Sequence, residues 1–275
     1  MPTRPLDRVL AVALLLAATA AVAKPPPDEP DNLLNDRLTL QASLERSSNH
    51  TAVRYDSSAG TPGTVLDGEK DLGLPARKLV GKAELMFRMK ERHRVRISNY
   101  YLPLDRRATT LLQETINFGN TTYNVNDIVQ SELKMRLLAI NYTYSFIKND
   151  RVELGASLGF DVIGFEAAAT VVARLRTERV DRSTPAPLAG LDGTVRISSR
   201  FYGEARAQYV KVDVQSVKGT LETYEANVLY RLSPNVTFGL GFSGIKVDVD
   251  ANKPTNGGLF TLHSAGPQLF ARVGF

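Results

Sequence analysis

The sequence predicts an all-β fold, a closed antiparallel up-and-down transmembrane barrel of about ten strands, with eight to twelve as the range. Three observations predict it. Apolar and polar residues alternate with a period of two over most of the chain, the connections are alternately short and long, and the last residue is the aromatic Phe275. Successive side chains of a strand point to opposite faces, so this period indicates strands with one apolar and one polar face.

The N-terminal segment, residues 1–23, is interpreted as a secretory signal peptide. Two arginines precede an apolar run over residues 9–23, which closes on a small-x-small cleavage pattern. The run is too short for a transmembrane helix, which needs about 20 apolar residues. Residues 24–35 are then expected to be a Pro-rich periplasmic lead-in, outside any core, and residues 36–275 to form the barrel.

Composition limits the classes of function. The chain has no cysteine, which excludes a disulfide framework and a thiolate metal site. A net charge of +5 with interspersed signs gives no nucleic-acid footprint. Neither a cofactor nor a metal site is predicted, because Asp248, Asp250 and Asn252 lack the glycine and glutamate of a calcium loop.

The alternating segments and their connections can be placed along the chain. The predicted strands lie around residues 37–45, 78–89, 94–101, 128–147, 151–162, 188–197, 201–214, 220–231, 236–249 and 259–275. Short turns are expected at 90–93, 148–151, 198–200 and 233–235, and long loops at 46–77, 105–127 and 166–187. The third long loop is expected to form a short helix or to extend two strands. Its arginines, Arg174, Arg176, Arg179 and Arg182, face either lipopolysaccharide or solvent.

This pattern resembles that of the bacterial outer-membrane β-barrel proteins, which join their strands by short periplasmic turns and longer extracellular loops. In that family the last strand commonly ends in phenylalanine after alternate apolar residues, and the assembly machinery reads this end. The matching residues are Leu269, Ala271, Val273 and Phe275. The resemblance implies export to the outer membrane, lipid and lipopolysaccharide as surroundings, and the barrel-assembly machinery as a partner.

Aromatic residues near the predicted periplasmic strand ends are expected to form a girdle at the membrane interface. They are Tyr142, Tyr144, Phe146, Phe201, Tyr202, Tyr230, Phe238 and Phe275. The alternative is a soluble periplasmic barrel that binds an apolar ligand, because a period of two does not tell which face is wet. The long strands, the alternating connections and Phe275 favour the membrane.

If the apolar faces meet lipid, the polar faces line the interior. The charges expected there are Glu84, Arg88, Arg96, Lys134, Arg136, Glu153, Asp161, Arg196, Glu204, Arg206 and Arg272. A ten-stranded barrel is only slightly wider than the eight-stranded type, whose lumen is filled by side chains. Buried charges need partners, so we expect a paired network that plugs the lumen. A narrow solute path is the alternative.

The sequence predicts a structural, adhesive or narrow-transport role and no enzyme, with a lipid-modifying hydrolase as the alternative. Three histidines restrict the possible general bases. His93 lies in a predicted turn, His50 in the first long loop, and His263 points outward near the outer rim. Lipid A deacylase barrels carry a surface His-x-Ser arrangement, but Ala265 stands at the serine position here, and Ser264 faces the other way. The Asp/His constellation of omptin-type proteases cannot be placed.

Overall fold

The computed structural model describes residues 32–275 except 112–113, 125–127, 172–175 and 215. The predicted signal peptide, most of the lead-in and Arg174 lie outside the described residues. Among the described residues, no helix is long and apolar enough to span a membrane.

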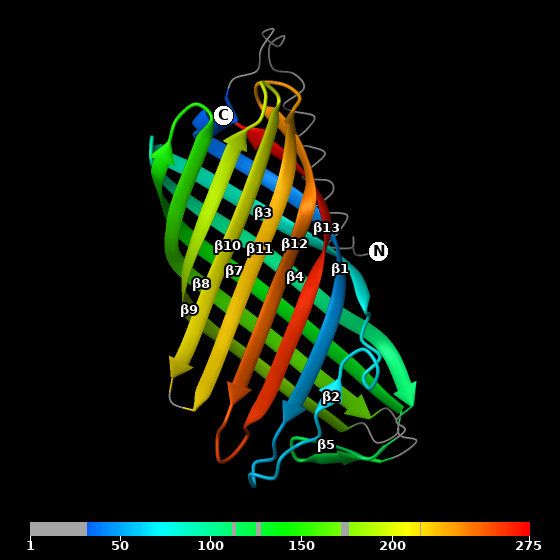
Figure 1. Ribbon diagram of the computed structural model, residues 1–275. Coiled ribbons are helices and arrows are strands. Elements are labelled where there is room, and N and C mark those ends of the chain that lie inside the picture. Colours follow the sequence, from blue (N-terminus) through cyan, green and yellow to red (C-terminus); the bar gives the residue numbers. More distant parts are fainter. Residues whose placement is uncertain (1–31, 112–113, 125–127, 172–175, 215) are drawn as a thin grey trace.

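Ten antiparallel strands form one closed barrel, as predicted (Figure 1). They are β1 (Leu38–Tyr55), β3 (Arg77–Lys90), β4 (His93–Leu111), β7 (Ile128–Lys148), β8 (Val152–Val171), β9 (Arg176–Arg196), β10 (Phe201–Val214), β11 (Val217–Arg231), β12 (Val236–Ala251) and β13 (Gly258–Gly274). Each strand pairs with its neighbour in the chain, and β13 pairs with β1 to close the sheet. Closure removes the free sheet edges around the terminal half, whereas the distal parts of β4 and β9 extend beyond their pairing with β3 and β10.

Four minor elements lie at the two ends. The 3-10 turn η1 (Leu33–Asn35) precedes β1, and the two-residue strand β2 (Leu66–Asp67) pairs with β1 beyond the end of β3. Strands β5 (Ile116–Phe118) and β6 (Thr121–Tyr123) form a separate hairpin between β4 and β7. We call the end that holds η1 and Phe275 the terminal end, and the end that holds β2 and this hairpin the distal end.

The four predicted tight turns are all present, and all lie at the terminal end. The strands that they join end within one residue of the predicted bounds. The strands extend further toward the distal end than the sequence predicted. Strand β1 runs to Tyr55, and β8 and β9 stay paired up to Val171 and Arg176. The third long loop is therefore largely strand, which corrects its predicted bounds of 166–187 and favours extended strands over a helix.

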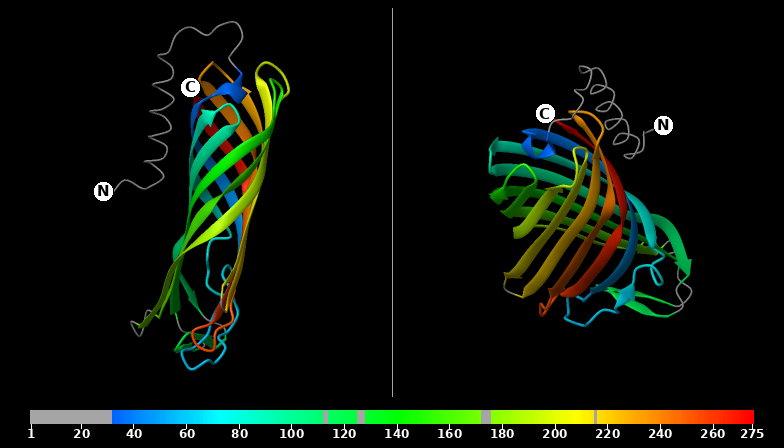
Figure 2. Two further views of the ribbon diagram at one scale, coloured as in Figure 1. Left: turned by 90° about the vertical axis from the view of Figure 1, so that its left-hand side faces the viewer. Right: turned by 45° about the horizontal axis from the view of Figure 1, so that its top comes forward.

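The barrel is flattened, so that β3, β4, β7 and β8 form a wall facing β10 to β13 (Figure 2). Near the terminal end its outer surface is apolar. Exposed aliphatic and aromatic side chains there are Phe87, Ile97, Leu138, Ile140, Leu158, Phe160, Leu191, Ile197, Leu240, Phe242 and Leu269. An outer ring of aromatic side chains follows at the terminal rim: Tyr142, Tyr144, Phe146, Phe201, Phe238 and Phe275 are exposed, and Tyr230 packs against Phe201. Tyr202 does not belong to it, because it points into the barrel and is 0% exposed.

The distal half reverses this polarity. On β12, the apolar Phe242 points outward and the polar Ser243 points inward. Further along the strand, the inward residue is the apolar Ile245 and the outward residue is the charged Lys246. The other strands switch at a similar level. Inward apolar residues then build one continuous core: Val53, Val80, Tyr100, Leu102, Leu104, Leu133, Met135, Leu137, Ala186, Leu188, Val210, Leu221, Ile245, Val247 and Leu262. The terminal half is thus apolar outside and charged inside, and the distal half is packed like a soluble protein.

Candidate functional site

The segment before β1 closes the terminal end of the lumen. Leu33 and Leu34 are buried, and the backbone N–H of Leu33 donates to the Tyr202 hydroxyl at 3.3 Å. Arg231, on β11, donates to both carboxylate oxygens of Asp36 at 2.9 Å each. Burial raises the pKa of the Asp36 carboxyl, and the hydrogen bond from Arg231 opposes that shift. The end of the predicted lead-in, residues 32–35, is therefore part of the packed barrel, which corrects the expectation that residues 24–35 lie outside it.

Ion pairs next to this cap join strands that are not neighbours in the sheet. Arg88 on β3 donates to both carboxylate oxygens of Glu153 on β8, at 2.9 Å each. Arg94 on β4 binds Asp192 on β9 at 2.6 Å. All four side chains are buried. A buried charge is costly without a partner, so these pairs hold the four strands in a fixed arrangement around the terminal part of the lumen.

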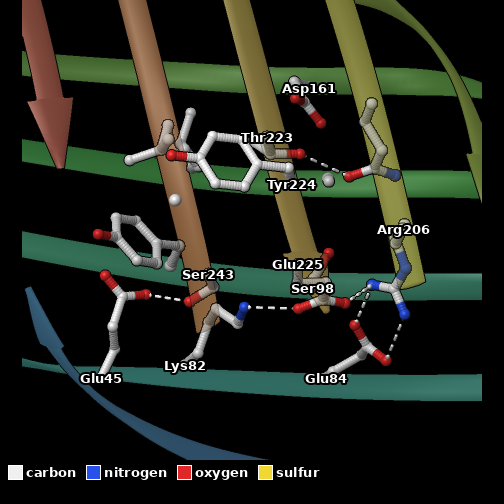
Figure 3. Close-up of a pocket in the computed structure, with 16 residues that line it drawn as sticks. Glu45, Lys82, Glu84, Ser98, Asp161, Arg206, Thr223, Tyr224, Glu225 and Ser243 are labelled. Atoms are coloured by element: carbon white, nitrogen blue, oxygen red, sulfur yellow. Dashed lines mark hydrogen bonds and ion pairs between the residues drawn. The ribbon is translucent and has the colours of Figure 1, made fainter. Parts of the chain in front are cut away.

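A second layer of charges lies further into the lumen. Glu84 on β3 accepts from Arg96 on β4 at 2.6 Å, and its other oxygen accepts from Arg206 on β10 at 2.8 Å. Lys82 donates to Glu225, on the opposite wall, at 3.0 Å. Figure 3 shows Arg206 and Glu84 pointing toward each other from opposite walls. Two acids and three bases are therefore paired at this level of the lumen.

The same side of the barrel carries one more pair. Arg272 on β13 binds both oxygens of Glu204 on β10 at 3.0 Å and also donates to the Gln41 side chain. The Arg272 guanidinium lies 5.5 Å from the ring centroid of Phe270. The aromatic ring in turn covers Gly239 on β12, where an added Cβ would come into contact with it. The lumen at this level is packed as well as charge-paired.

Most of the predicted lumen charges point inward, and two do not. Arg196 is on the inner face near the terminal turn, where its Nε donates to the Ser198 carbonyl at 3.3 Å. Lys134 and Arg136 share the outer face of β7 with Leu138, and Arg136 stacks over the Tyr101 ring at 5.1 Å. They lie in the distal half, where the outer face is polar, so their assignment to the lumen is corrected.

Sequence reasoning missed several members of the network. These are Asp36, Glu45, Lys82, Arg94, Asp192, Glu225 and Arg231. A signal for most of them was present, because each lies on the polar face of its strand by the period of two. What the sequence did not show is which of these charges stand opposite one another across the lumen.

A small cavity of about 80 Å³ lies where the polarity switches (Figure 3). Lys82, Glu84, Arg206 and Glu225 line its charged side, and Tyr100, Leu137 and Ile245 line its apolar side. Asp161 also lines it and is buried, and its Oδ1 has no hydrogen-bond partner among the described residues. One water molecule needs about 10–15 Å³ of such space, so the cavity suits a few waters that bind these polar groups.

Loop side chains close the distal end. Leu66, Leu72 and Leu74, from the connection between β1 and β3, are buried in the distal core. The β5–β6 hairpin adds Ile116, Phe118 and Tyr123 to it. The interior is therefore filled in three successive zones: the terminal cap, the ion-paired layers and this apolar plug.

Comparison with known proteins gives a fold. No protein-family model and no curated protein matches the sequence. Among solved structures, the outer membrane protease OmpT from Escherichia coli aligns over 87% of this chain and 97% of its own, with a TM-score of 0.57 and 12% identity. The chain has the fold of an outer-membrane β-barrel. The attachment invasion locus protein Ail of Yersinia pestis (TM-score 0.36, 11% identity, 85% of this chain and 99% of its own) and the Pseudomonas putida toluene transporter TodX (0.33, 7%, 90% and 92%) also match, less closely.

In this outer-membrane-type barrel, His263 and the serine next to it, Ser264, lie on opposite faces of the sheet. His263 points outward and is exposed, as predicted, whereas Ser264 is fully buried on the inner face, 3.5 Å from the Tyr100 hydroxyl. His93 lies at the terminal turn, where its Nδ1 contacts the Tyr142 hydroxyl at 2.5 Å. On the outer face, His50 stands directly opposite His263 across the β1–β13 pair.

Proposed function

We propose that this protein is an outer-membrane β-barrel with a sealed lumen and a structural or adhesive, non-catalytic role, and that its distal end is presented outside the cell. The observation that carries the proposal is the filling of the interior by the cap, the cross-wall ion pairs and the apolar plug. A solute path would have to open all three zones, and separating buried ion pairs leaves uncompensated charges.

The outer surface supports the membrane placement. On β13, the outward apolar positions run from Pro267 to Phe275, a length that matches the about 9–11 tilted residues of a membrane-spanning strand. Exposed aromatic side chains ring the terminal rim, as expected at a lipid headgroup boundary. Strands of up to 21 residues are longer than one crossing requires. The distal half, polar outside and apolar inside, is therefore assigned to the aqueous side.

Basic residues border the apolar belt on its distal side. Arg46, Arg77, Arg136 and Lys211 are exposed. Each lies two positions to the distal side of an outward apolar or aromatic residue of its strand: Leu44, Leu79, Leu138 and Tyr209. Such a ring would meet the phosphates of lipopolysaccharide, to which cations are attracted electrostatically. These basic residues support lipopolysaccharide as the lipid partner and an orientation with the distal end outside the cell.

Conductance of the refolded protein in a planar bilayer tests the sealed lumen. We expect no discrete current steps, and a general porin inserted into the same bilayer shows that the assay detects an open barrel. Insertion itself is verified separately, by protection of the belt from protease. Discrete steps from the verified, inserted protein would contradict the proposal and favour a narrow transport path. Recovery of the protein in the soluble periplasmic fraction would contradict the membrane placement.

A further inference from the structure

A cluster of metal-ligating side chains lies on the outer face of the distal half. Strand β2 runs beside the distal part of β1, on the side away from β13 (Figure 1). Asp67 on β2 stands opposite Ala52, which is two residues beyond His50 on the same outward face of β1. Glu69 follows in the turn after β2. The pairing of β2 with β1 and the turn after β2 thus bring the three side chains together.

The ligand atoms are close to a metal-binding arrangement. One atom from each of His50, Asp67 and Glu69 lies within 4.8 Å of the others, and His50 Nδ1 is 3.6 Å from Glu69 Oε2. Ligands held about 2.0–2.1 Å from a tetrahedral zinc ion are about 3.3 Å apart, so small side-chain rotations suffice. The His50 ring is 68% exposed and free to rotate.

The turn holds the two carboxylates in position. Asp67 Oδ1 accepts the backbone N–H of Glu69 at 3.1 Å and that of Lys70 at 2.9 Å. Its Oδ2 lies 3.7 Å from the Nζ of the exposed Lys70, an ion pair that a bound metal ion would replace. Glu69 Oε2 accepts the backbone N–H of Thr51 at 2.9 Å.

One atom of the cluster has no partner. Glu69 is only 12% exposed, and its Oε1 is buried without a hydrogen-bond partner among the described residues. A buried, unpaired carboxylate oxygen is costly, and a cation bound there would remove the cost. The alternative to a metal site is a simple ion pair between His50 and Glu69. That pair engages Oε2 of Glu69 and leaves its Oε1 without a partner among the described residues.

We propose that His50, Asp67 and Glu69 bind one divalent transition-metal ion of the zinc class. A neutral imidazole with two carboxylates suits zinc and similar ions, whereas calcium and magnesium take oxygen ligands only. A tetrahedral ion held by these three ligands has a fourth position for water. The ion ties the β1–β3 connection to the wall of the barrel at the distal end.

The test is a zinc titration of the purified protein, freed of metal and refolded in detergent micelles, against a chromogenic chelator at about pH 7.5. We expect one Zn²⁺ per chain. The variants His50→Ala and Glu69→Gln should each lower the affinity by about tenfold or more. His93→Ala is the matched control, because His93 lies at the opposite end of the barrel. This variant should bind Zn²⁺ as tightly as the wild type. Excess Ca²⁺ should not displace the bound Zn²⁺.

Folding of each variant is checked by heat-modifiable gel mobility, which should stay unchanged because His50 is exposed and Glu69→Gln keeps the size of the side chain. The proposal is overturned if the folded wild type binds no zinc, if His50→Ala or Glu69→Gln binds as well as the wild type, or if Ca²⁺ displaces zinc. The titration needs no bilayer and does not depend on lumen conductance. Its failure is therefore distinguishable from failure of the sealed-barrel proposal.

Discussion

Arg231 and Asp36 form a buried two-bond pair, at 2.9 Å for each bond, between the terminal end of β11 and the segment that enters β1. The pair fixes the cap that carries Leu33 and Leu34 over the lumen. Because this pair anchors the cap, we expect the cap to unfold together with the barrel. Loss of the pair should therefore lower the free energy of unfolding of the whole barrel.

Asp36→Ala should lower the free energy of unfolding by about 3–5 kcal/mol, because it leaves the Arg231 guanidinium buried and unpaired. The double variant Asp36→Ala with Arg231→Leu should lose less than Asp36→Ala alone, since no uncompensated charge remains. Reversible urea unfolding in liposomes measures both values. Simple additivity of the two single substitutions would show that the residues act independently and that the cap is not held by this pair.

The reversal of polarity along the strands predicts that a lysine costs much more stability at an outward position of the belt than at an outward position of the distal half. Leu240 is 68% exposed in the belt, and a lysine there should destabilise the barrel in lipid by about 2–4 kcal/mol. Thr261→Lys is the matched control: it lies on the outer face of β13 in the distal half and stands opposite Asp248. It should cost little. Equal losses in liposomes would mean that lipid also covers the distal half.

The inner face gives the complementary prediction. Leu262 is fully buried in the distal core, and Leu262→Ala should cost about 2–5 kcal/mol by leaving a cavity. Leu269 is on the same strand but points outward in the belt, 61% exposed, so Leu269→Ala leaves no cavity and should cost clearly less. Both are compared by urea unfolding in liposomes. A larger loss for Leu269→Ala would contradict the soluble-type packing of the distal half.

Much of this fold could be predicted from the sequence because its main signals are local. The period of two places side chains on alternate faces, and turn residues mark the tight connections, so ten strands and four turns were recovered. The distal strand extensions were missed because alternation there weakens among charged and small residues. Residues 32–35 were missed because a single 3-10 turn has too few residues to show a period.

The assignment of charges to the lumen assumed one polarity along each strand. That assumption fails beyond the belt, where water replaces lipid as the outer solvent, so a charge on the outer face no longer carries a cost. Lys134 and Arg136 share the face of Leu138 and Ile140 for this reason. The pairing of Arg206 with Glu84, and the meeting of His50 with Asp67, depend on flattening and register, which couple residues far apart in the chain.

Phe275 closes the barrel through its backbone, and its side chain takes no part in that closure. Its carbonyl accepts the N–H groups of Arg37 and Leu38, and its own N–H donates to the Leu38 carbonyl. The aromatic ring is 60% exposed on the outer face. Recognition of the ring by the assembly machinery can therefore be separated from closure by a side-chain substitution that keeps the backbone.

Phe275→Ser should leave folding into detergent micelles nearly unchanged, because every backbone hydrogen bond is kept and the ring is not part of the core. In cells we expect it to lower the amount of assembled barrel several-fold, because we propose that the assembly machinery reads the ring of Phe275. Lys253→Ser, in the exposed distal turn between β12 and β13, is the control and should assemble like the wild type. Heat-modifiable gel mobility of outer-membrane fractions measures assembly. Equal assembly of the two variants would show that the terminal ring is not read, and a parallel loss of folding in micelles would show that the ring acts on stability instead.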